Sequence, residues 1–404
     1  MTNEQIQDFL NEHNYDVRRT RNGRWIDQKC TMDVVCFVAD CILDYIDKNH
    51  TTTFESPNVW RSQYAKDNVA AVFGKPATDD FAAHDEFNKF FRQPTKMLAA
   101  AGILSEYLDG ITIQFTVVNR ELLEYIALRE KNAYNFLCMY IEKVLRDSGL
   151  WPSFERFFEA QDAWEFQVLK ERFIEFSIAN TPMNDKVEPS RIFTKVLNPL
   201  ACKFHKLGTE RGRLSKHIIT FDKIAYNQPN WRDELSGKEK NVARSDYSGA
   251  NNPQPSDYYN YRVGRAMKYL RQFNDLYNAG RSEVTDRFSI GVPATHVHHI
   301  FPKGIFKEIA DYVENMIVLT SGQHLQEAHP AGNTSIVNRD FQYICLLAKT
   351  ESIRKNLLAN HGEPVIYNFN DFTHVLSVGF CNDYFEYLAE NDFNSIVNKL
   401  EQFY

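Results

Sequence analysis

Histidines gather in one stretch near the carboxyl end of the chain. Residues 294–330 read ATHVHHIFPKGIFKEIADYVENMIVLTSGQHLQEAHP and hold five of the twelve histidines. His298 and His299 are adjacent, and Asn315 follows His299 by sixteen residues. His324 follows Asn315 by nine. Imidazole binds divalent metal ions, and a neutral imidazole accepts a proton from water near neutral pH because its pKa is about 6.5. These residue types are those that metal-assisted hydrolysis needs.

The elements expected around these residues would hold them in a defined arrangement. Alternating apolar residues predict a strand around His298 and His299 and a second strand over 316–319, followed by a short helix that carries His324. Adjacent residues on a strand point to opposite faces. His298 is therefore expected to face a metal ion while His299 faces a water molecule, and the helix returns His324 to the metal side.

This pattern resembles the ββα-metal finger of the HNH nuclease superfamily, whose members carry an Asp-His or His-His pair, a central Asn and a final His or Asn. The resemblance implies that His298 and His324 are metal ligands and that His299 is the general base. It also implies that Asn315 holds the loop and thereby orients His299. The chain differs from many members in having His298 where they have Asp, and in lacking paired CxxC motifs. Neither difference removes a catalytic group.

Two further histidines flank this set. Members of the superfamily often carry another helical His four residues after the first, whereas His329 follows His324 by five. On a regular α-helix that spacing turns a side chain about 140° away. Two roles for His329 therefore stay open, a third metal ligand or a surface residue at the helix end. His296 shares a strand face with His298 and is expected to be structural or to support the ligands.

The resemblance implies one divalent ion per finger, acting on the phosphodiester bonds of double-stranded DNA. Mg²⁺ or Mn²⁺ is expected because phosphate and water complete the shell, and Zn²⁺, Ni²⁺ or Co²⁺ also suits a ligand set rich in imidazole. The ion would neutralise charge that develops on the scissile phosphate. His299 would take the proton of the attacking water.

Positive charge is unevenly distributed along the chain. Residues 186–287 hold 19 Lys and Arg against 11 Asp and Glu, although the net charge of the whole chain is −7. Within the basic segment 191–216, Arg211 and Arg213 flank a glycine in an expected tight loop that would present two guanidinium groups to DNA. The segment 17–24 adds four arginines and is expected to be a basic arm. Solvated segments without a ligand are the alternative in both places.

A helix over 258–279 follows this basic segment. Arg262, Arg265 and Lys268 recur every three residues along it, and apolar residues occupy other positions. We therefore expect one face of the helix to pack and the other to present positive charge to DNA.

The amino-terminal region shows a different order of elements. Helices are expected over 31–45, 56–72 and 87–101, and alternating residues then predict a β-hairpin over 104–117. Three helices followed by a hairpin is the order of a winged-helix domain, a helix-turn-helix variant whose third helix often enters the DNA major groove. Domains of this kind also serve in protein packing, and both roles stay open.

The predicted fold class is α+β, mostly helical, and a chain of this length forms more than one domain. The expected parts are a winged-helix DNA-recognition domain at 1–130, a helical scaffold at 131–190, a basic DNA-binding region at 191–287 with a flexible loop at 236–257, an HNH nuclease domain at 288–360, and a helical extension at 361–404.

Composition excludes several classes of protein. The chain has no apolar run long enough to span a membrane, so no membrane association is expected. Its seven cysteines are scattered and never form a CxxC pair, which favours the reducing cytoplasm over secretion. No phosphate-binding or dinucleotide-binding glycine motif occurs, so no nucleotide cofactor is expected.

The function predicted from these observations is that of a metal-dependent DNA endonuclease, a sequence-specific restriction enzyme. A modification-dependent or less specific nuclease of phage defence is the alternative with the same chemistry. A winged-helix regulator whose finger binds metal without cutting is the alternative from another class. Because one finger cuts one strand, a homodimer on DNA is expected.

Overall fold

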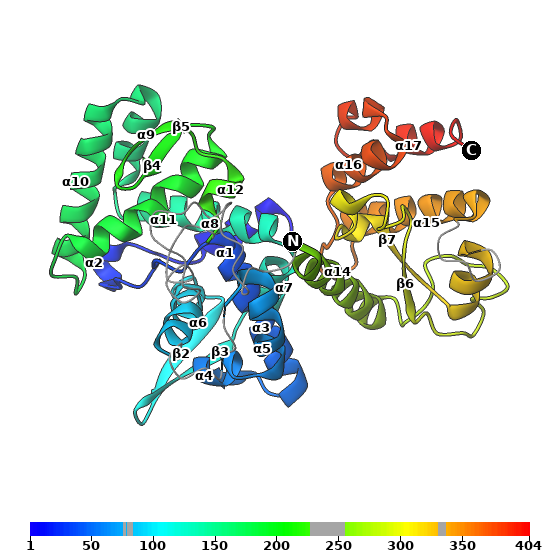
Figure 1. Ribbon diagram of the computed structural model, residues 1–404, viewed down its shortest axis with the longest axis horizontal. Coiled ribbons are helices and arrows are strands. Elements are labelled where there is room, and N and C mark those ends of the chain that lie inside the picture. Colours follow the sequence, from blue (N-terminus) through cyan, green and yellow to red (C-terminus); the bar gives the residue numbers. More distant parts are fainter. Residues whose placement is uncertain (76–77, 79–83, 227–254, 330–336) are drawn as a thin grey trace. The chain divides into compact units, whose positions relative to one another are not determined.

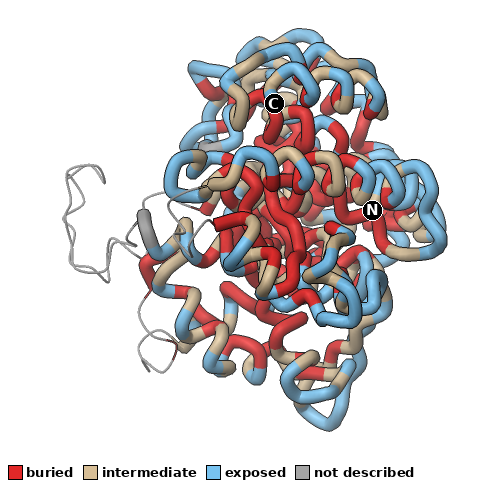
Figure 2. Tube along the Cα trace, turned by 90° about the vertical axis from the view of Figure 1, so that its right-hand side faces the viewer, coloured by how far each residue is buried: buried red, intermediate tan, exposed pale blue. Residues whose placement is uncertain are grey.

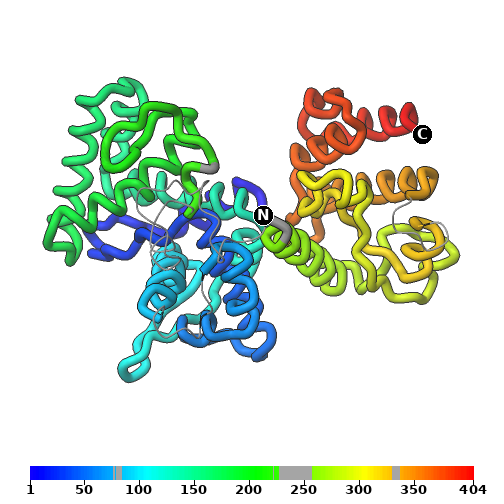
Figure 3. The backbone as a smooth tube through the Cα atoms, in the orientation of Figure 1, coloured from blue at the N-terminus to red at the C-terminus, as the bar shows by residue number. Residues whose placement is uncertain are grey.

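The computed structural model describes residues 1–75, 78, 84–226, 255–329 and 337–404. The chain divides into two compact units, Met1–Asp257 and Tyr258–Tyr404. Figure 3 follows the chain through the first unit, from blue to green, and through the second, from yellow-green to red. Helices make up 61% and strands 9%, and the strands form small antiparallel sheets. The expectation of a mostly helical α+β fold is confirmed.

Helix α3 (Met32–Asn49) is the central helix of the first unit. Nearly all of its residues are buried, including Asp33, Asp40 and Asp44, because the helix is enclosed by its neighbours in the chain. Those neighbours are α4 (Ser56–Trp60), α5 (Gln63–Phe73), α6 (His84–Ala100), α7 (Arg120–Leu128) and α8 (Glu130–Asp147).

A three-stranded sheet lies beside these helices. Strands β2 (Leu104–Asp109) and β3 (Thr112–Val117) form the hairpin expected from the sequence. The short strand β1 (Thr53–Glu55) pairs with the other edge of β3, which gives the order β1-β3-β2. Phe54 of β1 lies opposite Phe115 of β3, and their rings stack at 5.8 Å.

Aromatic side chains fill the interior of this region. The rings of Phe37, Phe73, Phe90 and Phe91 contact one another at centroid distances of 5.0 to 6.5 Å, mostly edge to face. Burial of each ring stabilises the fold by about 2–3 kcal/mol. Figure 2 shows the buried segments, in red, continuing through the interior.

The remainder of the first unit is helical with one hairpin. The continuous helical character expected over 132–179 is interrupted at Gly149 and Gln161, whose φ values of 71° and 54° are left-handed. The elements are α8, α9 (Trp151–Ala160), α10 (Ala163–Asn180), α11 (Val187–Lys203), β4 (Leu207–Glu210), β5 (Arg213–Ile218) and α12 (Phe221–Ile224). Two short helices, α1 (Asn3–Asn11) and α2 (Val17–Thr20), precede α3.

The second unit surrounds a two-stranded sheet with helices. Strands β6 (His296–His299) and β7 (Met316–Leu319) pair antiparallel, with His298 opposite Ile317. The other elements are α14 (Pro255–Tyr277), the 3₁₀ turns η3 (Lys307–Ile309) and η4 (Val313–Asn315), the π-helix η5 (Gln323–Ala328), α15 (Arg339–Leu358), α16 (Phe369–Phe380), η7 (Asp383–Tyr387) and α17 (Phe393–Leu400).

Helix α16 packs closely against the segment that follows β6. A Cβ atom at Gly379 would lie 2.4 Å from the ring of Phe301, so only glycine permits this approach. Phe301 also contacts the rings of Phe306 and Phe380. This packing fixes the end of the strand that carries the two adjacent histidines.

The predicted domain boundaries are only partly comparable with the two units. The basic segment 191–287 is divided between them. Residues 236–254 of the expected loop lie outside the described residues, and Pro255 already begins α14. None of the helices in the described part of the chain has both the length and the apolar run that crossing a bilayer requires.

Candidate metal centre

Strand β6 presents its two adjacent histidines in different directions. His298 and His299 are both buried, with 4% and 9% of their surfaces exposed. Side chains alternate along a strand, and the two rings accordingly have different partners. The ring of His298 lies among other histidines, whereas that of His299 contacts the backbone of the loop.

The helix after β7 begins with a capping box that the sequence contains as Thr320-x-x-Gln323. The Thr320 hydroxyl accepts from the Gln323 backbone N–H at 3.3 Å, and the Gln323 side chain accepts from the Thr320 N–H at 3.0 Å. Gln323 is fully buried and also bonds Ser282 and Val284. The capping box therefore anchors the first turn of the helix that carries His324.

This helix is a π-helix, and that geometry changes the expected position of His329. In a π-helix the hydrogen bonds join residues five apart, so residues with that spacing lie one above the other. His324 and His329 have this spacing, and their rings lie 4.9 Å apart. The rotation away from His324 that a regular α-helix predicts is therefore wrong.

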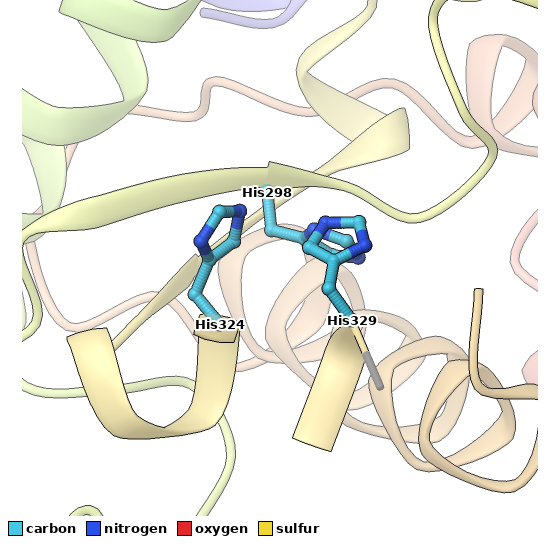
Figure 4. A group of neighbouring side chains, drawn as sticks. All are labelled: His298, His324 and His329. Atoms are coloured by element: carbon cyan, nitrogen blue, oxygen red, sulfur yellow. The ribbon is translucent and has the colours of Figure 1, made fainter. Parts of the chain in front are cut away.

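Three imidazoles converge at this place (Figure 4). One nitrogen from each of His298, His324 and His329 lies within 4.8 Å of the others. Two nitrogens that share a tetrahedral ion at about 2.1 Å are about 3.4 Å apart, so small side-chain rotations bring all three to coordination distance. Nδ1 of His324 is buried and has no hydrogen-bond partner among the described residues. The group can hold a metal ion.

The electrostatics of the group keep its rings in the form that binds metal. Burial, with the neighbouring His324 and His329, lowers the pKa of His298 to about 3. Burial, with His329 and His296, lowers the pKa of His324 to about 4. Both rings are neutral near pH 7 and carry a free lone pair.

His299 is oriented by the loop between the two strands. Its Nε2 lies 2.9 Å from the carbonyl oxygen of Ala310. A carbonyl oxygen only accepts, so Nε2–H donates and Nδ1 keeps the lone pair. Burial lowers the pKa of His299, and the hydrogen bond to Ala310 opposes this. His299 is therefore a neutral base with a defined tautomer.

Asn315 holds that loop closed. Its side-chain oxygen accepts from the Phe301 N–H at 2.9 Å, and its amide donates to the carbonyls of Phe301 and Ile309 at 3.1 and 3.2 Å. Its own carbonyl accepts from the N–H of Ile300. Asn315 is fully buried, so these bonds are shielded from water. The loop that orients His299 is braced from within.

Sequence reasoning missed a buried ion pair behind the strands. Lys349 of α15 and Glu283 lie 2.7 Å apart, and both side chains are almost inaccessible to solvent. Glu283 also accepts from the N–H of Val318 in β7, and Lys349 donates to the hydroxyl of Tyr367. No local pattern signals such a pair, because its members are separated by more than sixty residues.

His296 lies beside the three-histidine group but is not part of it. Its ring stacks on that of His324 at 5.1 Å, and its Nδ1 lies 3.1 Å from the hydroxyl of Thr295. This placement supports His324 from the solvent side of the strand.

The expected basic loop is the turn of the β4–β5 hairpin. Arg211 and Gly212 form the turn, both with positive φ, and Arg211 and Arg213 are exposed. Lys170 donates to the carbonyl of Gly212 at 2.8 Å, which adds a third positive charge at the turn. The structure thus brings together the two arginines identified from the sequence.

The basic residues of α14 are placed differently from the expected exposed face. Arg265 is buried against the ring of Tyr261, and Arg262 pairs with Asp311 at 2.5 Å. Lys268 is half-buried. This placement does not favour a free basic face, and DNA contact by these three residues stays a prediction.

Comparison with models of protein families, with curated proteins and with solved structures finds no match to this chain.

Proposed function

We propose that this protein is a metal-dependent endonuclease that hydrolyses phosphodiester bonds of double-stranded DNA, with an HNH-type ββα-metal finger as its active site. One observation carries the proposal. The three-histidine group and the neutral ring of His299 stem from one strand pair and the helix that follows it. The pairing of a metal site with an adjacent base is what hydrolysis of a phosphodiester requires.

The residues present fit a divalent metal ion. His298, His324 and His329 would hold it, and the buried, unbonded Nδ1 of His324 points to a ligand because such an atom otherwise costs about 1–3 kcal/mol. When bound, the ion supplies positive charge for the scissile phosphate. Mg²⁺ or Mn²⁺ suits the phosphate and water that complete the shell, and Zn²⁺, Ni²⁺ or Co²⁺ suits three imidazoles.

His299 would act as general base through Nδ1. The Ala310 carbonyl fixes the proton on Nε2, so Nδ1 accepts the proton of a water aligned for attack. Asn315 would be a positioning residue, because its bonds to Phe301 and Ile309 hold the loop that carries Ala310.

Unit 1 supplies features suited to DNA. Its order of helix, strand, helices and hairpin, with β1 beside β3, is consistent with a winged-helix domain. Arg211 and Arg213 would add phosphate contacts. A finger that reads no bases leaves specificity to such a unit, which supports a restriction-type enzyme over a non-specific one.

The direct test incubates supercoiled plasmid with the protein and Mg²⁺ or Mn²⁺, with His299→Ala as control. Discrete fragments are expected. A smear of fragments would indicate the less specific defence nuclease. DNA left intact with every divalent metal tried, although the protein binds it, would contradict the nuclease and favour the winged-helix regulator.

A homodimer on DNA is part of this proposal. One finger provides one base and cuts one strand, so two copies related by a two-fold axis would cut both strands of a palindromic site. Light scattering with and without DNA should show two copies on the duplex. A one-to-one complex that accumulates nicked circles before linear DNA would contradict it.

A further inference from the structure

Helix α6 has two unlike faces. Its apolar residues, listed at the end of this sentence, are buried in the core of unit 1: Phe87, Phe90, Phe91, Met97 and Leu98. On the other side, Lys89, Arg92, Gln93 and Lys96 follow the spacing i, i+3, i+4, i+7 and so form one polar stripe. Asn88 lies one turn before Arg92 at the edge of the stripe.

The polar stripe borders a cleft of about 470 Å³. The cleft is lined by Arg24, Asp27, Asn88, Lys89, Arg92, Gln93 and Lys96. Arg24 belongs to the arginine-rich segment 17–24, which the structure holds in place, since Arg24 pairs with Asp27 and with Glu188, each at 2.5 Å. The expected basic arm is therefore part of the wall of this cleft.

The charges of the stripe are of two kinds. Lys96 pairs with Glu106 of β2 at 2.7 Å. In contrast, the exposed side chains of Lys89 and Arg92, and the amide of Asn88, make no hydrogen bond or ion pair within the described part of the chain. Polar groups of these three residues are thus available at the surface of a helix whose other side is anchored in the core.

We propose that this face of α6 binds double-stranded DNA in the major groove, with Arg92 and Asn88 contacting base edges and Lys89 contacting a phosphate. The inference rests on the proposed function in one respect, that double-stranded DNA is the substrate. It goes further in naming the recognition surface, which belongs to unit 1 and is separate from the metal centre.

Chemistry favours this ligand. The major groove admits an α-helix, and guanidinium and carboxamide groups match the edges of guanine and adenine bidentately. The cleft joins a guanidinium and two amides to two ammonium groups, a combination that reads bases and backbone together. The β4–β5 turn presents cations without an amide, which suits phosphates only.

The test measures binding apart from cutting. Full-length protein carrying His299→Ala, with its metal retained, is mixed with a labelled library of duplexes whose central base pairs are randomised. Bound duplexes are sequenced, and affinity is followed by fluorescence anisotropy at several salt concentrations. The variants are Arg92→Ala, Asn88→Ala and Lys89→Ala.

Arg92→Ala and Asn88→Ala should each relax the preference at one base pair and weaken binding of the selected duplex about tenfold. Lys89→Ala should weaken binding of all duplexes alike and make the salt slope shallower by about one unit. The matched control, Arg156→Ala with Arg172→Ala, removes two exposed charges from α9 and α10 and should leave the base preference unchanged. Thermal unfolding checks that all variants fold.

A library without any preferred sequence, or α6 variants that keep the parent's preference and salt slope, would overturn the inference. Its failure is distinguishable from that of the proposed function. Loss of binding in the α6 variants of a protein that never cuts would retain the surface and reject the nuclease. Sequence-specific cutting with unaltered α6 variants would retain the nuclease and reject the surface.

Discussion

The β4–β5 and β6–β7 hairpins share one device and differ in what it supports. In each, a buried asparagine bonds both the N–H and the carbonyl of one backbone residue. Asn198 does so with Thr209 in the first hairpin, and Asn315 with Phe301 in the second. The first hairpin is closed by a tight turn with exposed arginines, whereas sixteen residues join the strands of the second.

The length of the connection explains the difference in chemistry. A tight turn exposes its side chains to water, where they keep their charge and attract a polyanion. The long loop of the second hairpin instead returns the Ala310 carbonyl to His299 and leaves β7 followed by a helix of ligands. Charge for binding needs only exposure, but a neutral base and a metal site need burial and bracing.

Replacing the base gives the largest effect that this comparison predicts. His299→Ala should lower the single-turnover rate of plasmid cleavage by about 10²–10⁴-fold, because a general base acts in the transition state. DNA affinity should be almost unchanged. The matched control is His296→Ala, on the same strand but outside the three-histidine group. A variant that keeps more than about a tenth of the rate would rule out His299 as the base.

Removing a metal ligand comes next. His298→Ala, His324→Ala and His329→Ala should each lower affinity for Mn²⁺ or Zn²⁺ by about 100-fold, measured by calorimetry on protein first stripped with a chelator. The result for His329 is the sharpest of the three. A regular helix would turn this ring away, so undiminished affinity in His329→Ala would contradict the π-helix arrangement.

The two asparagines provide a paired test of the shared device. Asn315→Ala leaves the buried N–H of Phe301 without its partner and should cost about 1–3 kcal/mol of unfolding free energy. Asn198→Ala should cost a similar amount in unit 1. Only Asn315→Ala should also lower the cleavage rate under conditions where both variants are folded. Equal cleavage by the two would show that Asn315 does not position His299.

The smallest effect is expected at the exposed turn. Arg211→Ala with Arg213→Ala should weaken binding to every duplex and reduce the salt slope by about two units, since each arginine would neutralise one phosphate. The cleavage rate at saturating DNA should stay constant. An unaltered slope would mean that the turn is solvated surface without a DNA contact.

Residue type and spacing along the chain were sufficient to predict the strand-loop-strand-helix order and the convergence of His298 and His324. Strand alternation and helical periodicity are local properties, so adjacent histidines and a histidine just after the second strand already define a shared site. The amphipathic pattern of α3 and the β2–β3 hairpin were predictable for the same reason.

Tertiary structure alone decided the rest. A π-helix, which no residue pattern here announced, brought His329 into the group, and packing against Tyr261 buried Arg265 despite its helical spacing. The Glu283–Lys349 pair and the Ala310 bond to His299 join residues that are distant in the chain or that act through backbone. Spacing specifies which way a side chain points from its own element, but what it meets depends on how the elements pack.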